Sequence, residues 1–188
     1  MIKISKHFFN IIVSQLNCIS RIAAMENAEK TQLFTKQVID NLRYRYCREG
    51  QIVKITEELE AAKNLLEMFK VRYGDVLSYK IDIDKTCVDI YIPHYTVLTF
   101  VDESIYKSFD KREGDFFIQV SVQKRNEYAE ISITDNGKGF DEVSDLNNGY
   151  GSVQSIKNRL IQHYGPEHVL KFENLENGFS AVKILITV

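Results

Sequence analysis

The spacing of apolar residues changes once along the chain, and this change divides it into an all-helical part and a mixed part. The first 73 residues contain no proline and one glycine, Gly50. Their apolar residues recur every three to four positions, as in amphipathic helices. One stripe comprises Ile4, Phe8, Ile11, Ile12, Ile19 and Ile22, and a second comprises Leu33, Phe34, Val38, Ile39, Leu42 and Tyr46. Two such helices in succession predict a helical hairpin that packs against another chain; the alternative is that both helices pack on their own domain.

A third helix is predicted to begin at Thr56, whose hydroxyl can accept hydrogen bonds from free backbone N–H groups. Glu57 and Glu58 follow in the first turn, where the helix dipole favours negative charge. Glycine is the usual residue just past a helix end, so this helix is expected to stop at Gly74.

From Tyr79 the pattern becomes period two, because apolar Tyr79, Ile81 and Ile83 alternate with charged residues. The elements expected after this strand are a helix over 93–109 with Pro93 in its opening turn, a strand hairpin over 118–122 and 129–133, a helix over 152–164, and strands near 169–173 and 180–188. This order predicts an α+β fold, a two-layer sandwich in which a mixed, mostly antiparallel sheet carries helices on one face.

Composition and charge exclude several classes of protein. The chain has 188 residues, of which 44% are apolar and 27% charged, as in an ordinary globular protein. A net charge of −2 leaves no excess of Lys and Arg for phosphates, so nucleic-acid binding is not expected. Asn10 and the pair Ser14-Gln15 interrupt the apolar run near the start, so we expect no membrane span in this chain.

A glycine-rich segment carries the chemistry. Residues 135–140 read DNGKGF after a predicted strand, and residues 149–153 read GYGSV before a predicted helix. Glycines let the backbone approach a ligand closely, and a helix N-terminus favours phosphate. Asp135 would present a carboxylate to a donor such as the amino group of adenine. Walker A and Rossmann motifs are absent, and Asp-Asn-Gly is also a common turn, so the pattern alone leaves nucleotide binding and a plain turn both open.

Several segments in this order resemble a known family. DNGKGF, GYGSVQSIKNRL and ENGFSAVKILI resemble motifs of the GHKL (Bergerat) ATP-binding fold. Residues 56–84 resemble the helix and first strand of LytS/YesM-type sensor histidine kinases, and IPHYTVLTFVDESIYKS resembles that family's segment ending in V-E-N-A-I-K-H-G. The resemblance covers essentially the whole chain. It implies a GHKL ATP-binding domain at 53–188, preceded by a helical dimerisation and acceptor-like region at 1–52.

The resemblance also implies an ATP pocket between the helix at 93–109 and the loop at 135–151. Asp135 takes the place of the family's adenine-binding aspartate, and Ser180 takes the place of a Thr that supports it. The remaining cofactor-binding positions are the turn glycines Gly137 and Gly139 and the glycines beside the phosphates, Gly149 and Gly151.

The opposite wall of the implied pocket departs from the family. Asp102 falls on the family's Glu, where it would orient an attacking group, and Glu103 falls on its Asn, the Mg²⁺ ligand. A carboxylate can still bind that hard cation. Lys107, on the family's His, would contact phosphate. The alternative is that Glu103 and Lys107, four apart on a helix, form only a solvated ion pair.

The acceptor position departs further. Matching VSQLNCI to the family's F-N-T-L-N-S-I puts Asn10 on the phosphate-accepting His. An amide nitrogen is no substitute for imidazole as a nucleophile, because its lone pair is delocalised. His7 lies one helical turn earlier and is an alternative acceptor only in a different register; otherwise it is an ordinary helix residue.

The function implied by the resemblance is that of the catalytic core of a two-component sensor histidine kinase. Such a core uses ATP and Mg²⁺, forms a homodimer, phosphorylates a response regulator and is cytoplasmic, within a parent protein anchored in the membrane. The replacements at Asn10 and Glu103 leave two alternatives open. One is a catalytically degenerate, kinase-like binding or scaffold protein, and the other is an anti-sigma-type serine kinase.

Overall fold

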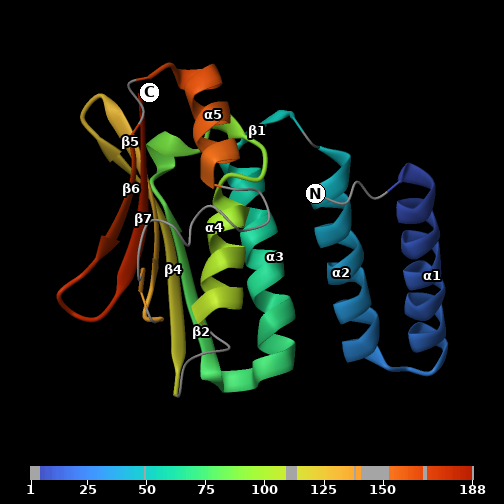
Figure 1. Cartoon of the computed structure of the whole chain (residues 1–188). Helices are drawn as coiled ribbons and strands as arrows, with labels where there is room; N and C mark the ends of the chain where they lie inside the picture. The colour runs from blue at the N-terminus through green and yellow to red at the C-terminus, as the bar shows by residue number, and fades with distance from the viewer. Residues whose placement is uncertain are drawn as a thin grey trace.

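The computed structural model describes residues 5–48, 50–108, 114–137, 139–140, 153–166 and 169–187 (Figure 1). The helices are α1 (Lys6–Met25), α2 (Glu29–Cys47), α3 (Ile55–Tyr73), α4 (Val97–Glu103) and α5 (Val153–Tyr164). The strands are β1 (Ile52–Lys54), β2 (Leu77–Ile83), β3 (Tyr91–Pro93), β4 (Phe116–Arg125), β5 (Tyr128–Asp135), β6 (Val169–Asn174) and β7 (Ser180–Thr187).

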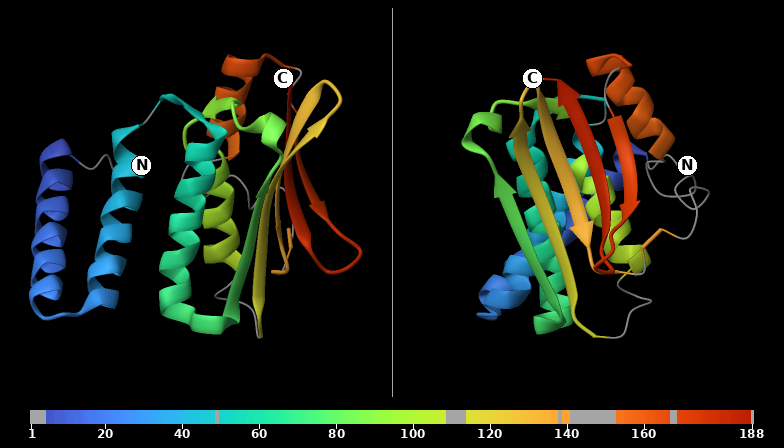
Figure 2. Two further views of the ribbon diagram at one scale, coloured as in Figure 1. Left: turned by 180° about the vertical axis from the view of Figure 1, so that it is seen from behind. Right: turned by 90° about the vertical axis from the view of Figure 1, so that its left-hand side faces the viewer.

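The main sheet has five strands in the order β2-β4-β5-β7-β6. β2 pairs with β4 in parallel, and the other pairs are antiparallel. The helices α3, α4 and α5 cover one face of this sheet (Figures 1 and 2). The predicted α+β class, with a mixed sheet and helices on one face, is therefore confirmed. The core lies between these layers and includes Leu66, Val101, Val120, Ile131, Ile156 and Ile184.

The prediction of a helix over 93–109 is wrong at its start. Pro93 ends β3 and is paired with Ile52 of β1 in a small antiparallel sheet. The helix starts only at Val97, because Tyr95 has a positive φ of 65°, which interrupts helical geometry. Beyond Glu103 the chain continues as a π-helical turn, Ser104–Ser108. β1 and β3 are three residues each, too short for a periodic signal.

The predicted cap of α3 at Thr56 is also wrong. α3 begins at Ile55, directly after β1, and its N-cap residue is Lys54. The Lys54 N–H donates to the Glu57 carboxylate over 3.3 Å, so Glu57 satisfies a group at the helix start. At the other end Gly74 has a φ of 62° and ends the helix, as predicted.

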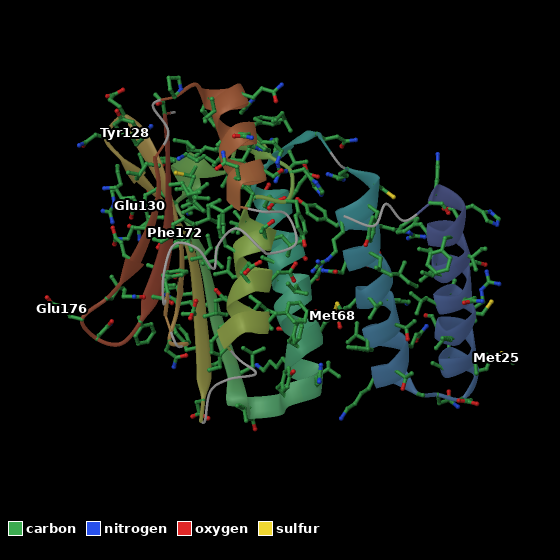
Figure 3. The ribbon with its side chains drawn as sticks, viewed as in Figure 1. Met25, Met68, Tyr128, Glu130, Phe172 and Glu176 are labelled. Atoms are coloured by element: carbon green, nitrogen blue, oxygen red, sulfur yellow. The ribbon has the colours of Figure 1, made fainter. Side chains whose placement is uncertain are left out.

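The hairpin of α1 and α2 stands beside the sheet layers, with α2 between α1 and α3 in Figure 1 and in the left view of Figure 2. Val13 and Ala23 of α1 and Ile39 of α2 are buried in it. The opposite face of α1 exposes Phe8, Ile11, Ile19, Ile22 and Met25, the last at the end of the helix (Figure 3). Within the described residues, α1 is the one helix long and apolar enough to cross a membrane, a test that core helices of soluble proteins also pass.

Candidate nucleotide site

Asp135 forms the centre of the candidate site at the end of β5. Its side chain is buried, with 4% of the residue exposed, and three donors hold the carboxylate. The Gly137 N–H donates to Oδ1 over 2.9 Å and the Ser180 hydroxyl donates to the same oxygen over 3.2 Å. The Ser104 hydroxyl donates to Oδ2 over 2.8 Å. The carboxylate is thus fixed by β7, by the turn after β5 and by the helix on the other layer.

The turn after β5 is anchored on both sides. Asn136 accepts a hydrogen bond from the Phe117 N–H over 2.8 Å, which ties the turn to β4. Asn174 of β6 accepts from the Phe140 N–H over 2.9 Å and donates to the Phe140 carbonyl over 3.0 Å. Gly139 has a φ of +80°, and a Cβ added there would lie 2.6 Å from the Asn174 side-chain oxygen. Only glycine fits this position without a shift of Asn174.

The phosphate end of the predicted pocket lies outside the described residues. Gly149 and Gly151 fall in the range 141–152, and the description resumes at Val153, where α5 begins. Lys107 belongs to the π-helical turn, but its side chain is likewise outside the description.

Asp102, on the opposite wall, is bound by a residue of the hairpin. Arg45 of α2 donates from Nη2 to Asp102 Oδ1 over 2.6 Å, and the Tyr95 hydroxyl donates to Oδ2 over 2.5 Å. Burial lowers the pKa of Arg45, but the Asp102 carboxylate outweighs this effect and the net change is upward. Burial, reinforced by Asp102, raises the pKa of Tyr95. At neutral pH Arg45 therefore keeps its positive charge and the Tyr95 hydroxyl keeps its proton.

Glu103, the predicted Mg²⁺ ligand, is the last residue of α4. It lines a cavity of about 550 Å³ between α2, α3 and α4, which Asp102 and Tyr106 also line. Ser104, one residue further, is the group of this helix that contacts Asp135. No group of three or more His, Cys, Asp or Glu side chains in the described part of the chain could hold a metal ion by itself. A cation at Glu103 would thus need oxygen ligands from a nucleotide, which is how Mg²⁺ is usually bound.

A buried carboxylate joins α2 to the start of α4. Glu58 is fully buried; its Oε2 accepts the N–H groups of Val97 and Leu98 over 2.9 and 3.1 Å. Its Oε1 accepts the Tyr95 N–H over 2.6 Å and the hydroxyl of Tyr44, a residue of α2. Burial raises the pKa of Glu58, although the four donors oppose this effect. The sequence predicts Glu58 only as a negative charge in the first turn of α3, and its capping of α4 is a finding of the structure.

Asn10 and His7, the two candidate acceptor positions, are both exposed on α1. Asn10 lines a second cavity of about 450 Å³ with Tyr44 and Arg48. Because α2 lies between α1 and the sheet layers, the structure does not bring Asn10 to Asp135 (Figure 1).

Sequence reasoning missed three residues of this region. Ser104 and Asn174 contact the Asp135 carboxylate and the turn that follows it, and Arg45 binds Asp102. The sequence could have indicated Ser104, because this residue lies directly beside the predicted metal position Glu103. Asn174 and Arg45 lie on other elements, 34 and 57 residues from their partners, and no feature of the sequence indicated these contacts.

A family model and two relatives similar to this chain all belong to sensor proteins or histidine kinases. The family model for histidine kinases, described as "Histidine kinase", matches residues 2–77. The sensor protein LytS of Enterococcus faecalis is 25% identical over 199 residues, which cover 98% of this chain and 32% of that protein. The sensor histidine kinase/phosphatase LytS of Staphylococcus aureus is 24% identical over 192 residues, covering 94% of this chain and 32% of the relative. The chain thus spans about a third of the length of these relatives.

Solved structures share the fold. The histidine kinase domain of the Erythrobacter litoralis blue-light activated kinase EL346 superposes with a TM-score of 0.54 at 16% identity, covering 95% of this chain and 93% of that one. The Acinetobacter baumannii histidine kinase AdeS gives a TM-score of 0.54 at 13% identity, covering 98% of this chain and 86% of the other.

Proposed function

We propose that the chain is a kinase core of the LytS type, to whose members it is similar over nearly its whole length, and that residues 53–188 bind ATP in a pocket centred on Asp135. The observation that carries this proposal is the Asp135 carboxylate, buried at a strand end and oriented by three donors. A carboxylate in that setting suits a neutral hydrogen-bond donor such as the amino group of adenine. The Ser104 and Ser180 hydroxyls fix its direction before a base arrives.

The triphosphate would run from Asp135 along α4 toward Glu103, and Gly149 and Gly151 would contact the phosphates at the start of α5. A bound Mg²⁺ would neutralise charge on the phosphate oxygens, with Glu103 as its protein ligand. In the observed arrangement Arg45 and Tyr95 each bind one oxygen of Asp102 and hold this carboxylate toward α2. Release of Arg45 would free Asp102 to orient an attacking group.

The preference of the chain for adenine over hypoxanthine, the base of inosine triphosphate, tests this proposal. Calorimetry with ATP and with inosine triphosphate, each with Mg²⁺, compares a base that donates an amino hydrogen with one that presents a carbonyl oxygen. We expect ATP to bind at least about tenfold more tightly, because the carbonyl would face a buried carboxylate. Equal affinities for the two nucleotides would contradict adenine recognition by Asp135.

The hairpin at 1–52 is proposed to form a homodimer. The support is the exposed apolar stripe of α1, since such surfaces mark contacts with other proteins. We further propose that the domain works in the cytoplasm, in a parent protein held at the membrane, and that an active form would transfer phosphate to a response regulator.

Asn10 favours a second function, that of a kinase-like binding protein that does not transfer phosphate. An amide at the acceptor position removes the nucleophile. Incubation with γ-labelled ATP should therefore leave the wild-type chain without acid-labile label, and Asn10→His should gain some. His7→Ala should change nothing in either background. Acid-labile labelling of the wild type that is lost in His7→Ala would overturn this assignment.

A further inference from the structure

The cavity between α2, α3 and α4 has the size and lining of a small-molecule site. Its volume is about 550 Å³, within the range of pockets that bind drug-sized ligands. Val38 and Leu42 of α2 face Leu65, Met68 and Phe69 of α3 across it. Figure 3 shows Met68 on the side of α3 that faces α2. Both parts of the chain, hairpin and sheet layers, thus contribute apolar walls.

One polar group in the wall of this cavity has no partner among the described residues. Asn41 is 7% exposed, and its side-chain Nδ2 makes no hydrogen bond there. Its Oδ1 accepts the Nε–H of Arg45 over 2.6 Å, so the amide cannot be turned around without setting two donors against each other. A buried N–H group without an acceptor is unfavourable, and such groups usually have a protein, water or ligand partner.

The charges beside Asn41 do not require a charged ligand. Arg45 and Asp102 neutralise one another through their 2.6 Å ion pair, and the Tyr95 hydroxyl takes the second Asp102 oxygen. Glu103 adds negative charge at the same end, which disfavours an anionic ligand there. A neutral ligand with an oxygen acceptor complements both the walls and the Asn41 donor.

We propose that this cavity binds an uncharged organic molecule with an apolar ring system and one carbonyl or ether oxygen, which accepts a hydrogen bond from Asn41 Nδ2. The cavity lies apart from the adenine end of the proposed nucleotide pocket, because Ser104, which follows α4, contacts Asp135, whereas Arg45 and Asn41 of α2 line the cavity. Glu103, the proposed Mg²⁺ ligand, lies at the end of α4 between the two. Since the walls come from both α2 and α3, a ligand there stabilises the contact between the hairpin and the sheet layers.

Prodan, a neutral naphthalene ketone whose emission shifts to the blue in apolar surroundings, is a suitable probe. Titration of the full chain with Prodan should show saturable, blue-shifted emission. Asn41→Leu removes the donor at similar size, and we expect about three- to tenfold weaker binding. Met68→Trp fills the cavity from the other wall and should weaken binding by at least about tenfold. This variant keeps both Asn41 and Arg45.

Matched controls separate the cavity from other surfaces. Phe8→Ala and Ile22→Ala shorten exposed apolar side chains on α1 and should leave Prodan binding unchanged. Asp135→Asn should also leave it unchanged, whether or not that variant binds ATP. Equal binding by the wild type, Asn41→Leu and Met68→Trp would overturn the proposal. Displacement of Prodan by ATP with Mg²⁺ from the wild type, abolished in Asp135→Asn, would assign the cavity to the nucleotide site and overturn it as well.

Discussion

The contact between Arg45 and Asp102 joins the hairpin to the sheet layers, and a double-mutant cycle tests its strength. The two side chains are 19% and 11% exposed, and the atoms are 2.6 Å apart. Loss of one partner leaves a charge in a mostly buried place, which costs about 3 kcal/mol in comparable pairs. Asp102→Asn keeps the shape of the side chain and Arg45→Met keeps an unbranched apolar stem, and each is expected to lower the free energy of unfolding by about 2–3 kcal/mol.

The double variant should lose less than the sum of the single losses, because it leaves no uncompensated charge. We expect a coupling free energy of about 2 kcal/mol. Urea unfolding followed by circular dichroism suits this chain, which has no tryptophan.

A second ion pair in the same chain is a matched control. Lys183 and Glu173 also lie 2.6 Å apart, but their side chains are 30% and 35% exposed. Water screens this pair, so its coupling should be at most about 0.5 kcal/mol. Equal coupling free energies for the two pairs would refute the reasoning, since the two pairs have the same N–O distance and differ in burial.

Three further predictions concern stability and assembly. Burial raises the pKa of Glu58 above its ordinary value of 4.5, so folding favours the protonated form. The stability advantage of the wild type over Glu58→Gln should therefore shrink as pH rises above that value. Urea unfolding at several pH values checks this, and an advantage that grows with pH would contradict it. Gly139→Ala should lower the free energy of unfolding by more than Gly178→Ala, because both have a φ of +80° but only the first Cβ meets Asn174; equal losses in urea unfolding would count against that contact. Sedimentation should give about twice 21.8 kDa for the wild type and the monomer mass for Ile19→Asp with Ile22→Asp, whereas Tyr128→Asp on β5 should stay dimeric; a monomeric wild type would exclude the proposed dimer.

The regular elements could be predicted because their signal is local. Three- to four-residue spacing of apolar side chains marks α1, α2 and α3, and alternation marks β2, β4 and β5. The same logic fails at Pro93, where a proline expected in a helical turn ends a short strand instead. Its partner, Ile52, lies 41 positions away, and a three-residue strand leaves no period to read.

The residues of the candidate site also fall into those that the sequence could predict and those that it could not. Asp135, Gly139 and Ser180 belong to continuous motifs that resemble those of a family, so the sequence could predict them as parts of one pocket. The capping of α4 by Glu58 depends on a fully buried carboxylate, whereas its position in the sequence indicated only a favourable charge in the first turn of α3. The pairing of Arg45 with Asp102 depends on how α2 packs, which no local pattern in the chain encodes.

The affinity of the chain for ATP with and without the Asp135 carboxylate tests the central claim most directly. Calorimetry with ATP and Mg²⁺ on Asp135→Asn should show at least about a tenfold loss, because the adenine amino group would face a weaker and misdirected acceptor. Asp115→Asn removes an exposed carboxylate just before β4, near the end of β5 that carries Asp135, and this variant should bind ATP as the wild type does. Equal affinity of the wild type, Asp135→Asn and Asp115→Asn would contradict the placement of the nucleotide pocket at Asp135.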